Sequence, residues 1–262
     1  KKSALLLMYM TKMLAGRDDD LEYTNVLRLI GMDNFNLLFP DFFDSVDPVI
    51  PKQTDWSFID KPQTSFPLNY AVLDTITETI KKPNPDNGSN NWAISEAKSI
   101  TGNPILANDP HLGLNLPSIW MMMQLCSPTH NVMGTTIPGA LSIISGFNQN
   151  IAWGETNATR DVIDWYKIEF NQDRTKYLYN DLWKDVKNRL EEIKIRGGET
   201  IIDTVLYTHH GPVVYDRNFK SNNQRTGYAM RWIAHDGGNH QRTFIELNKA
   251  KNYDDYVNAL KY

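Results

Sequence analysis

The sequence predicts an α+β protein with helices near both ends and a long, mostly antiparallel β-rich centre. Apolar residues recur at helical spacing in the first third of the chain, for example over Leu5–Leu14. From residue 92 onward, short segments rich in β-branched and aromatic residues alternate with turn signals, which is typical of strands. Residues 244–262 return to a helical pattern, so the strand-rich part is bounded by helices on both sides.

The helical part of the chain divides at glycines and prolines. Asp18-Asp19-Asp20 supplies the capping and first-turn acids of a second helix, which we expect to end at Gly31, with one further turn at 34–38. Five prolines between residues 39 and 67 predict an extended stretch with little regular structure. A third helix is predicted over 68–82, and a linker rich in proline, asparagine and glycine follows it.

The strand-rich part contains ten segments with strand character. They are 92–95, 104–107, 119–125, 132–136, 142–146, 151–153, 165–169, 190–196, 200–208 and 228–233. Turn residues separate them at short intervals, which favours antiparallel connections.

Composition limits the classes of protein that the chain can represent. A hydrophobic content of 41% over 262 residues, with 7 Trp, predicts a packed globular protein. The formal net charge of −4 gives no electrostatic reason to expect nucleic acid or an anionic membrane as a partner. No apolar run approaches the ~20 residues that span a bilayer. The single Cys126 excludes both an intramolecular disulfide and a zinc cluster built on cysteines.

The junction Gly88-Ser89-Asn90-Asn91-Trp92 joins the polar linker to the first strand segment. Taken alone, such a triplet in a linker is most simply interpreted as a turn. Its interpretation changes because an ordered series of motifs follows it. They are 107–112 (Ala-Asn-Asp-Pro-His-Leu), 117–120 (Pro-Ser-Ile-Trp), 131–134 (Asn-Val-Met-Gly), 138–139 (Pro-Gly), 146–148 (Gly-Phe-Asn), 151–157 (Ile-Ala-Trp-Gly-Glu-Thr-Asn), 161–164 (Asp-Val-Ile-Asp) and 210–213 (His-Gly-Pro-Val).

This series resembles the penicillin acylase family of N-terminal-nucleophile hydrolases, from the region 13–25 through Ala259-Leu260. The resemblance implies a precursor that is cut into an α chain and a β chain, which remain together as a heterodimer. Residues 1–88 then correspond to the later part of the α chain with its spacer, and residues 89–262 to the opening of the β chain. The implied fold is an αββα sandwich, two stacked antiparallel sheets flanked by helices. The family also implies a periplasmic or exported protein, although this chain carries no signal peptide.

The implied reaction is hydrolysis of a small N-acyl amide, such as a penicillin, a cephalosporin or an N-acyl homoserine lactone, through an acyl-Ser intermediate. Ser89 Oγ would first attack the Gly88 carbonyl, shift the acyl group from nitrogen to oxygen, and let water resolve the ester. The α-amino group freed at Ser89 has a reference pKa of about 7.7–8.0 and can act as the base for its own hydroxyl. One residue then supplies both nucleophile and base.

The resemblance assigns two further catalytic positions. The backbone N–H of Asn157 corresponds to one oxyanion donor. His111 corresponds to a position that orients the nucleophile, against the simpler interpretation of a turn histidine. A second oxyanion donor, an Asn side chain, corresponds to a position beyond Tyr262, so we expect this chain by itself to lack a complete active site.

Ligand-binding positions follow from the same resemblance. Asp161, Asp164 and the Ile163 carbonyl match residues that bind calcium, and Glu22 matches the ligand from the α chain. Hard oxygen ligands of this kind suit Ca²⁺, although a solvated acidic turn also accounts for these residues. The acyl pocket is expected to involve Met13, Arg17 and Leu112, which could equally pack the core.

Two alternatives remain open at this stage. The chain could be an unprocessed, non-catalytic fragment that serves as a scaffold or binding module. It could also be a metallohydrolase built on His111, His209, His210 and Asp161. Adjacent residues on a strand point to opposite faces, so we expect the His209-His210 pair to be structural.

Overall fold

The computed structural model describes residue 11, residues 19–40, 53, 55, 88–113, 116–157, 162–215 and 225–262. The helices predicted over 5–14 and 68–82, and the proline-rich stretch 39–67, fall largely outside these residues. The chain forms two compact units. Unit 1 contains Lys1–Arg17, Ile80–Ile163 and Arg231–Tyr262, and unit 2 contains Asp18–Thr79 and Asp164–Met230.

The centre of unit 1 is a four-stranded antiparallel sheet with the order β3-β4-β5-β6. Its strands are Met121–Cys126, Asn131–Thr136, Ser145–Asn148 and Ala152–Trp153. Each strand pairs with the next one along the chain, as short turns dictate. These strands follow the predicted segments closely, because alternating apolar residues and short turns are local signals.

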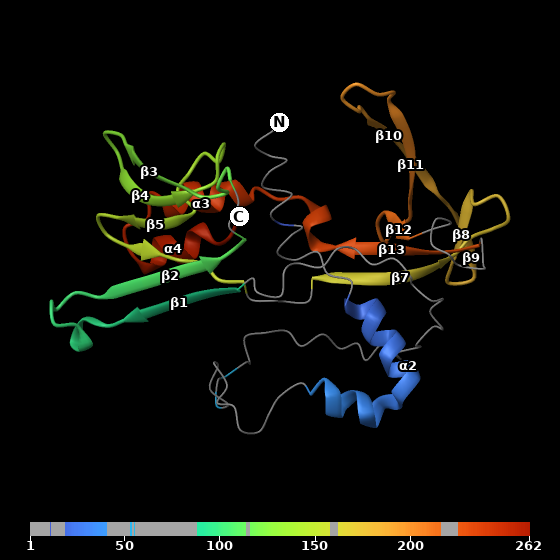
Figure 1. Cartoon of the computed structure of the whole chain (residues 1–262), viewed down its shortest axis with the longest axis horizontal. Helices are drawn as coiled ribbons and strands as arrows, with labels where there is room; N and C mark the ends of the chain where they lie inside the picture. The colour runs from blue at the N-terminus through green and yellow to red at the C-terminus, as the bar shows by residue number, and fades with distance from the viewer. Residues whose placement is uncertain are drawn as a thin grey trace. The chain divides into compact units, whose positions relative to one another are not determined.

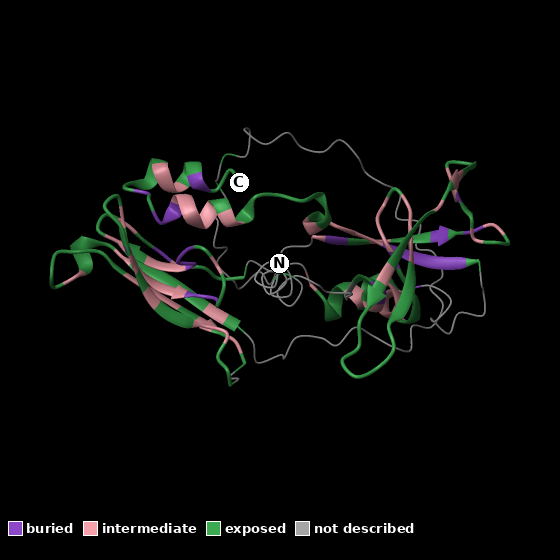
Figure 2. Cartoon of the chain, turned by 90° about the horizontal axis from the view of Figure 1, so that it is seen from above, coloured by how far each residue is buried: buried purple, intermediate pink, exposed green. Residues whose placement is uncertain are grey.

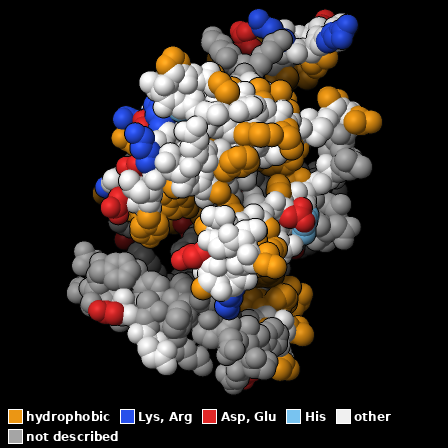
Figure 3. All heavy atoms as spheres, turned by 90° about the vertical axis from the view of Figure 1, so that its left-hand side faces the viewer, with side chains coloured by type: hydrophobic (Ala, Val, Ile, Leu, Met, Phe, Trp, Pro, Cys, Tyr) orange, Lys and Arg blue, Asp and Glu red, His pale blue; other side chains and the backbone are white. Residues whose placement is uncertain are grey.

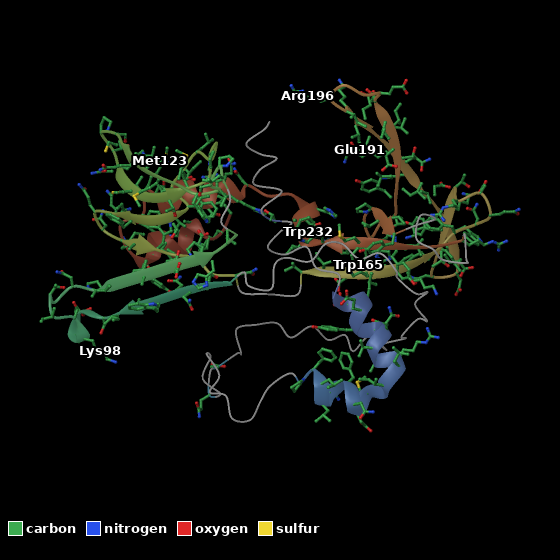
Figure 4. All side chains as sticks on the ribbon, in the orientation of Figure 1. Lys98, Met123, Trp165, Glu191, Arg196 and Trp232 are labelled. Carbon is green, nitrogen blue, oxygen red and sulfur yellow. The ribbon has the colours of Figure 1, made fainter. Side chains whose placement is uncertain are left out.

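Two short helices, α3 (His240–Leu247) and α4 (Tyr253–Ala259), cover one face of this sheet (Figures 1 and 2). Their buried residues pack with inward-facing sheet residues in one cluster, which Met123 (labelled in Figure 4) also joins. The cluster consists of Val132, Ile143, Trp153, Leu247 and Ala259. The single helix expected over 244–262 is therefore two helices, and Asn252 caps the second by accepting a hydrogen bond from the backbone N–H of Asp255.

A two-stranded hairpin completes unit 1. Strand β1 (Gly88–Ile94) runs antiparallel to β2 (Ile105–His111), with Gly88 opposite His111 and Ile94 opposite Ile105. A 3-10 turn, η1 (Glu96–Lys98), follows β1. The hairpin begins four residues earlier than predicted, because the polar residues at 88–91 are part of the strand.

The described residues of unit 2 form β-structure and the helix α2 (Figure 1). A three-stranded sheet has the order β12-β13-β7, formed by Val213–Tyr215, Thr226–Trp232 and Ile163–Glu169. The unit also contains two separate hairpins: β8 (Lys176–Tyr179) with β9 (Leu182–Asp185), and β10 (Lys187–Ile193) with β11 (Ile201–Tyr207). The 3-10 turn η2 (Ile233–Asp236) follows β13. The buried cluster of this unit consists of Ile168, Phe170, Tyr177, Val213 and Ala229.

Aromatic packing supports the three-stranded sheet. The ring of Trp165, labelled on β7 in Figure 4, lies 4.9 Å from the ring of Tyr215 on β12, centroid to centroid. Such pairs contribute about 0.5–1.5 kcal/mol beyond the area they bury. The two residues lie on different strands of one sheet, so the contact stabilises the order of the sheet rather than one hairpin.

The β8–β9 hairpin was not among the predicted strands. Its turn residues, Asn180 and Asp181, both have positive φ, 49° and 60°. A two-residue turn of this kind matches the right-handed twist of the strands it joins. The sequence signal was weak because the turn has an Asn-Asp pair instead of the more familiar Asn-Gly.

The helix of unit 2, α2, spans Asp19–Leu38 and has a kink at Gly31, where φ is 76° and ψ is 167°. The prediction that regular helix stops at Gly31 and resumes near residue 34 is thus confirmed in outline, because glycine adopts this backbone geometry without a side-chain clash. Among the described residues, no helix combines the length and apolar content needed to cross a bilayer. The mixed fold with few helices and many strands agrees with the predicted α+β class.

Candidate active site

Ser89 lies at the start of β1, half-buried and directly opposite Pro110 on β2. Proline has no backbone N–H, so the residue opposite Ser89 can donate no ladder hydrogen bond to it. The peptide carbonyl of Ser89 instead accepts a hydrogen bond of 3.4 Å from the hydroxyl of Thr156. The nucleophile candidate is therefore held by contacts from outside its own hairpin.

The loop that follows β6 contacts the Ser89 hydroxyl directly. Thr156 Oγ1 lies 2.5 Å from Ser89 Oγ, and the backbone N–H of Asn157 donates to Ser89 Oγ over 3.4 Å. These partners are 67 and 68 residues away from Ser89 along the chain. The predicted nucleophile and the predicted oxyanion donor thus meet in the same unit, next to a hydroxyl group that the sequence interpretation did not single out.

His111 lies at the same end of the β1–β2 register as Ser89, opposite Gly88. Its Nε2 is 2.8 Å from Asp109 Oδ2 and 3.5 Å from Asn90 Nδ2. A Cβ added to Gly88 would be 3.6 Å from the other ring nitrogen, Nδ1. His111 therefore borders the Gly88–Ser89 bond, and its role in orienting the Ser89 hydroxyl stays a prediction.

The contact with Asp109 has a chemical consequence for the imidazole of His111. A carboxylate can only accept, so Nε2 carries the proton in the neutral ring and Nδ1 keeps its lone pair. That lone pair is on the nitrogen nearest the position of a Gly88 side chain. The arrangement can accept a proton near the predicted scission point.

Asn108 connects the strand of Ser89 to the loop of Asn157. Its side-chain Nδ2 donates to the carbonyls of Asn90 (3.0 Å) and Glu155 (2.7 Å). Its Oδ1 accepts from the backbone N–H of Glu155 (3.2 Å) and from Ser145 Oγ (2.7 Å). Three segments of unit 1 converge on one side chain.

Glu155 carries an unusual charge state for a loop residue. Desolvation by the surrounding protein raises the pKa of its carboxyl from 4.5 to about 7. The residue as a whole keeps an exposed surface, so water moderates the effect of burial on this carboxyl. Near neutral pH this carboxyl exists in both the protonated and the ionised form, one residue away from Thr156.

The predicted acyl pocket is only partly within the described residues. Leu112 is half-buried immediately after β2, and its N–H donates to the Pro110 carbonyl over 3.1 Å. Met13 and Arg17 lie outside the described residues. The composition of the pocket therefore stays a prediction.

The predicted calcium ligands are distributed over α2 and the start of β7. Glu22 is half-buried on α2, whereas Ile163 is buried and Asp164 exposed at the start of β7. Asp161 lies outside the described residues. Over the part of the chain that the structure describes, no three His, Cys, Asp or Glu residues group so as to hold a metal ion.

The expectation that His209 and His210 point to opposite faces is wrong. They sit in a turn, where backbone hydrogen bonds join Thr208 and Gly211, and not in a strand. Their rings lie 3.8 Å apart, centroid to centroid, and the His210 ring stacks on Tyr166 at the same distance. Burial, His209 and Lys184 together lower the pKa of His210 to about 4, which is consistent with a structural pair.

Sequence reasoning assigned no role to Asn108, Asp109, Glu155 or Thr156, although all four lie in motifs that carry the resemblance. One local signal could have pointed to them. Asn and Asp are depleted in strands, yet β2 contains Asn108-Asp109 between apolar residues. Polar residues in such positions need specific partners, and here those partners form the site.

Comparisons with known proteins agree with the resemblance. The whole chain, residues 1–262, matches the family described as penicillin amidase. It is 31% identical over 183 residues to the acyl-homoserine lactone acylase QuiP of Pseudomonas aeruginosa, which covers 66% of this chain and 22% of that protein. It is 33% identical over 132 residues to the penicillin acylase 2 proenzyme of Pseudomonas sp. strain SE83, which covers 48% of this chain and 16% of that protein. The chain thus spans less than a quarter of the length of these relatives.

The chain is also similar in fold to a solved structure. The thermostable penicillin G acylase from Alcaligenes faecalis is similar with a TM-score of 0.56 and 24% sequence identity, covering 66% of this chain and 30% of that chain. This likeness agrees with the mixed architecture described above. Because the family match extends over every residue from 1 to 262, the chain belongs to the penicillin amidase family.

Proposed function

We propose that this chain is the nucleophile-bearing part of an acylase that hydrolyses small N-acyl amides, with Ser89 as the nucleophile. One observation carries the proposal. The backbone N–H of Asn157 reaches Ser89 Oγ over 3.4 Å, from a loop that is distant in sequence. A nucleophilic hydroxyl beside a fixed N–H donor is the minimal arrangement for acyl transfer through a tetrahedral intermediate.

Processing would precede catalysis. Ser89 Oγ attacks the Gly88 carbonyl carbon, and the C–N bond breaks as the nitrogen of Ser89 takes a proton. Water then hydrolyses the Gly88 ester, which leaves a carboxylate at Gly88 and a free amine at Ser89. Gly88 favours this attack because it places no side chain against the carbonyl. Residues 1–88 would then belong to one chain of a heterodimer and residues 89–262 to the other.

Catalysis would repeat the same chemistry on a substrate. The α-amine of Ser89 removes the hydroxyl proton, Ser89 Oγ forms an ester with the acyl group, and the amine product leaves with a proton. Water hydrolyses the ester and restores Ser89. The N–H of Asn157 would stabilise the oxyanion, a contribution of about 2.7–4 kcal/mol for a single donor. The names of the relatives favour N-acyl homoserine lactones and penicillins as substrates to test.

The αββα sandwich is part of this proposal. Unit 1 contains a sheet with helices α3 and α4 against one face, which corresponds to one α layer and one β layer. Several large apolar side chains of this unit are exposed, among them Met122 at 70% and Phe147 at 51%. Figure 3 shows hydrophobic side chains gathered on the side of the molecule that it views. A second stacked sheet would bury such side chains.

A calcium ion and a periplasmic or exported location also belong to the proposal, on the resemblance. Glu22, Asp164 and the Ile163 carbonyl would supply hard oxygen ligands, together with Asp161. Among the described residues these ligands offer fewer oxygens than the six to eight that Ca²⁺ takes, and the proposed reaction at Ser89 does not need the ion. Metal analysis of the purified full-length protein tests the site, and cell fractionation tests the location.

The proposal is tested on the full-length protein by intact mass and by acylase assay. Wild type should cleave between Gly88 and Ser89 and release the amine from an N-acyl homoserine lactone or a penicillin. Ser89→Ala should remain one chain and be inactive. Ser95→Ala, an exposed serine of the same hairpin, is the matched control and should behave like wild type. A wild-type protein that stays whole and inactive would favour a non-catalytic scaffold instead.

A further inference from the structure

The side chain of Asn108 uses all of its hydrogen-bonding capacity. An amide offers two N–H donors and an oxygen with two lone pairs. Both donors and both lone pairs have partners within 3.2 Å, contributed by Asn90, Glu155 and Ser145. Few half-buried side chains are committed to this extent, because water usually satisfies part of such a group.

The partners also fix the orientation of the amide. Glu155 presents a carbonyl to Nδ2 and an N–H to Oδ1. Turning the amide over would place Oδ1 against two carbonyls and Nδ2 against an N–H donor. Asn108 therefore binds both the carbonyl and the N–H of Glu155, as the backbone of a neighbouring strand would.

The loop approaches Asn108 closely at the residue before Glu155. A Cβ added to Gly154 would lie 2.7 Å from Cβ and 2.8 Å from Cγ of Asn108, closer than real Cβ atoms come. The loop can reach the amide because residue 154 is glycine. Gly154 and Asn108 together determine where the loop leaves β6.

These contacts lie next to both residues of the proposed reaction, Ser89 and Asn157. Asn90, whose carbonyl accepts from Asn108, is the residue after Ser89. Glu155 is two residues before Asn157, the oxyanion donor. Because the Ser89 Oγ and Asn157 N–H are 3.4 Å apart, a small displacement of either backbone would separate them beyond hydrogen-bonding distance.

We propose that Asn108 is a positioning residue that holds the Ser89 strand and the 154–157 loop in catalytic alignment. This inference rests on the proposed function, because alignment matters only if Ser89 and Asn157 react together. Asn108 does not touch the reacting atoms. It acts through the backbones of Asn90 and Glu155, while Ser145 holds its oxygen in place.

The direct test is Asn108→Asp in the full-length protein. Aspartate keeps the size and both acceptor positions but loses both N–H donors, and its carboxylate faces the carbonyls of Asn90 and Glu155. A displacement of about 1 Å in a reacting geometry can cost about 100-fold in rate. We expect self-cleavage and kcat to fall about 100-fold while KM stays within about threefold, since Asn108 is not among the predicted pocket residues.

The matched control is Asn150→Asp, the same chemical change at an exposed turn residue between β5 and β6. Its self-cleavage and kcat should stay within about twofold of wild type. Ser145→Ala is a second, milder variant for the case in which Asn108→Asp does not fold. It removes one bond to Asn108 Oδ1, and it should slow self-cleavage about tenfold.

Hydrogen exchange separates this inference from the proposed function. Amides of the peptide covering 152–157 should exchange faster in Asn108→Asp than in wild type, whether or not the protein is an enzyme. An active wild type with unchanged rates in Asn108→Asp and Ser145→Ala overturns the positioning role and leaves the function standing. An inactive, uncleaved wild type overturns the proposed function. Unchanged hydrogen exchange in Asn108→Asp overturns the inference that Asn108 holds the 154–157 loop.

Discussion

Two asparagine side chains hold unit 1 together in different ways. Asn248, after α3, is 4% exposed and makes a reciprocal pair of bonds with the backbone of Ile143, 2.7 Å from Nδ2 to the carbonyl and 2.8 Å from the N–H to Oδ1. Asn108 is half-buried, and its bonds reach three segments.

The difference in burial and in bonding partners indicates a different role for each asparagine. Asn248 fixes the end of α3 to the segment between β4 and β5 in a dry environment, where an unpaired backbone group is costly. Asn108 connects loops beside the candidate nucleophile, where water can partly replace a lost bond. We therefore expect Asn248 to control stability and Asn108 to control the rate of the reaction.

The largest effect on stability is expected for Asn248→Ala. The change leaves the N–H and carbonyl of Ile143 buried without partners, each at a cost of about 1–3 kcal/mol, so the free energy of unfolding should fall by about 3 kcal/mol. Urea denaturation followed by circular dichroism measures it. Asn108→Ala should cost clearly less, and an equal or larger loss there would erase the distinction between the two residues.

A glycine substitution tests the contact that brings the loop to Asn108. Gly154→Ala places a methyl group 2.7 Å from Asn108 Cβ, and overpacking of this kind typically costs about 1–3 kcal/mol. Adding Asn108→Gly removes both Cβ and Cγ of residue 108 and gives the methyl group room, so the double variant should be less destabilised than the sum of the two single variants. Strict additivity in denaturation midpoints would show that the two residues do not meet.

The hydroxyl that touches Ser89 should have a smaller effect. Thr156→Val keeps the shape of the side chain and removes the 2.5 Å contact with Ser89 Oγ. A hydrogen bond of this kind is worth about 1 kcal/mol, so self-cleavage and kcat should fall about five- to tenfold. Thr156→Ser retains the hydroxyl and should stay near wild type. Identical rates for the valine and serine variants would exclude a role for the hydroxyl.

The smallest effect concerns pH. The pKa of Glu155 is raised to about 7 from 4.5, so the folded state binds more protons than the unfolded state between these values. The free energy of unfolding therefore falls as pH rises from about 4.5 through 7, because ionised Glu155 is less stable in the folded state than in the unfolded state. Glu155→Gln should reduce the loss, measured as the change in Tm between pH 4.5 and 8. Parallel pH profiles for the two proteins would contradict the assignment.

Local patterns in the sequence predicted much of the fold. The strands of the four-stranded sheet were predicted because their alternation and turns are short-range signals. The β8–β9 hairpin was missed because Asn180 and Asp181 form its turn with positive φ at both residues. The helical end was predicted as one helix because its break at 248–252 is determined by the tertiary contacts of Asn248.

The site was predictable only in part, for a related reason. Ser89, His111 and Asn157 were assigned through resemblance. Ser89 and Asn157 are 68 residues apart in the sequence, so their contact leaves no periodic signal there. Asn108 and Thr156 act through partners 47 and 67 residues away. The placement of His209 and His210 depended on a turn that the strand pattern did not reveal.

The central claim is that Ser89 becomes the first residue of its own chain and the nucleophile. It is tested by treating the full-length protein with an arylsulfonyl fluoride, which labels activated serines, and locating the label by peptide mass spectrometry. We predict one label per molecule, on a peptide that begins at Ser89 with a free α-amine. A label on another residue, or a labelled Ser89 still joined to Gly88, would contradict it.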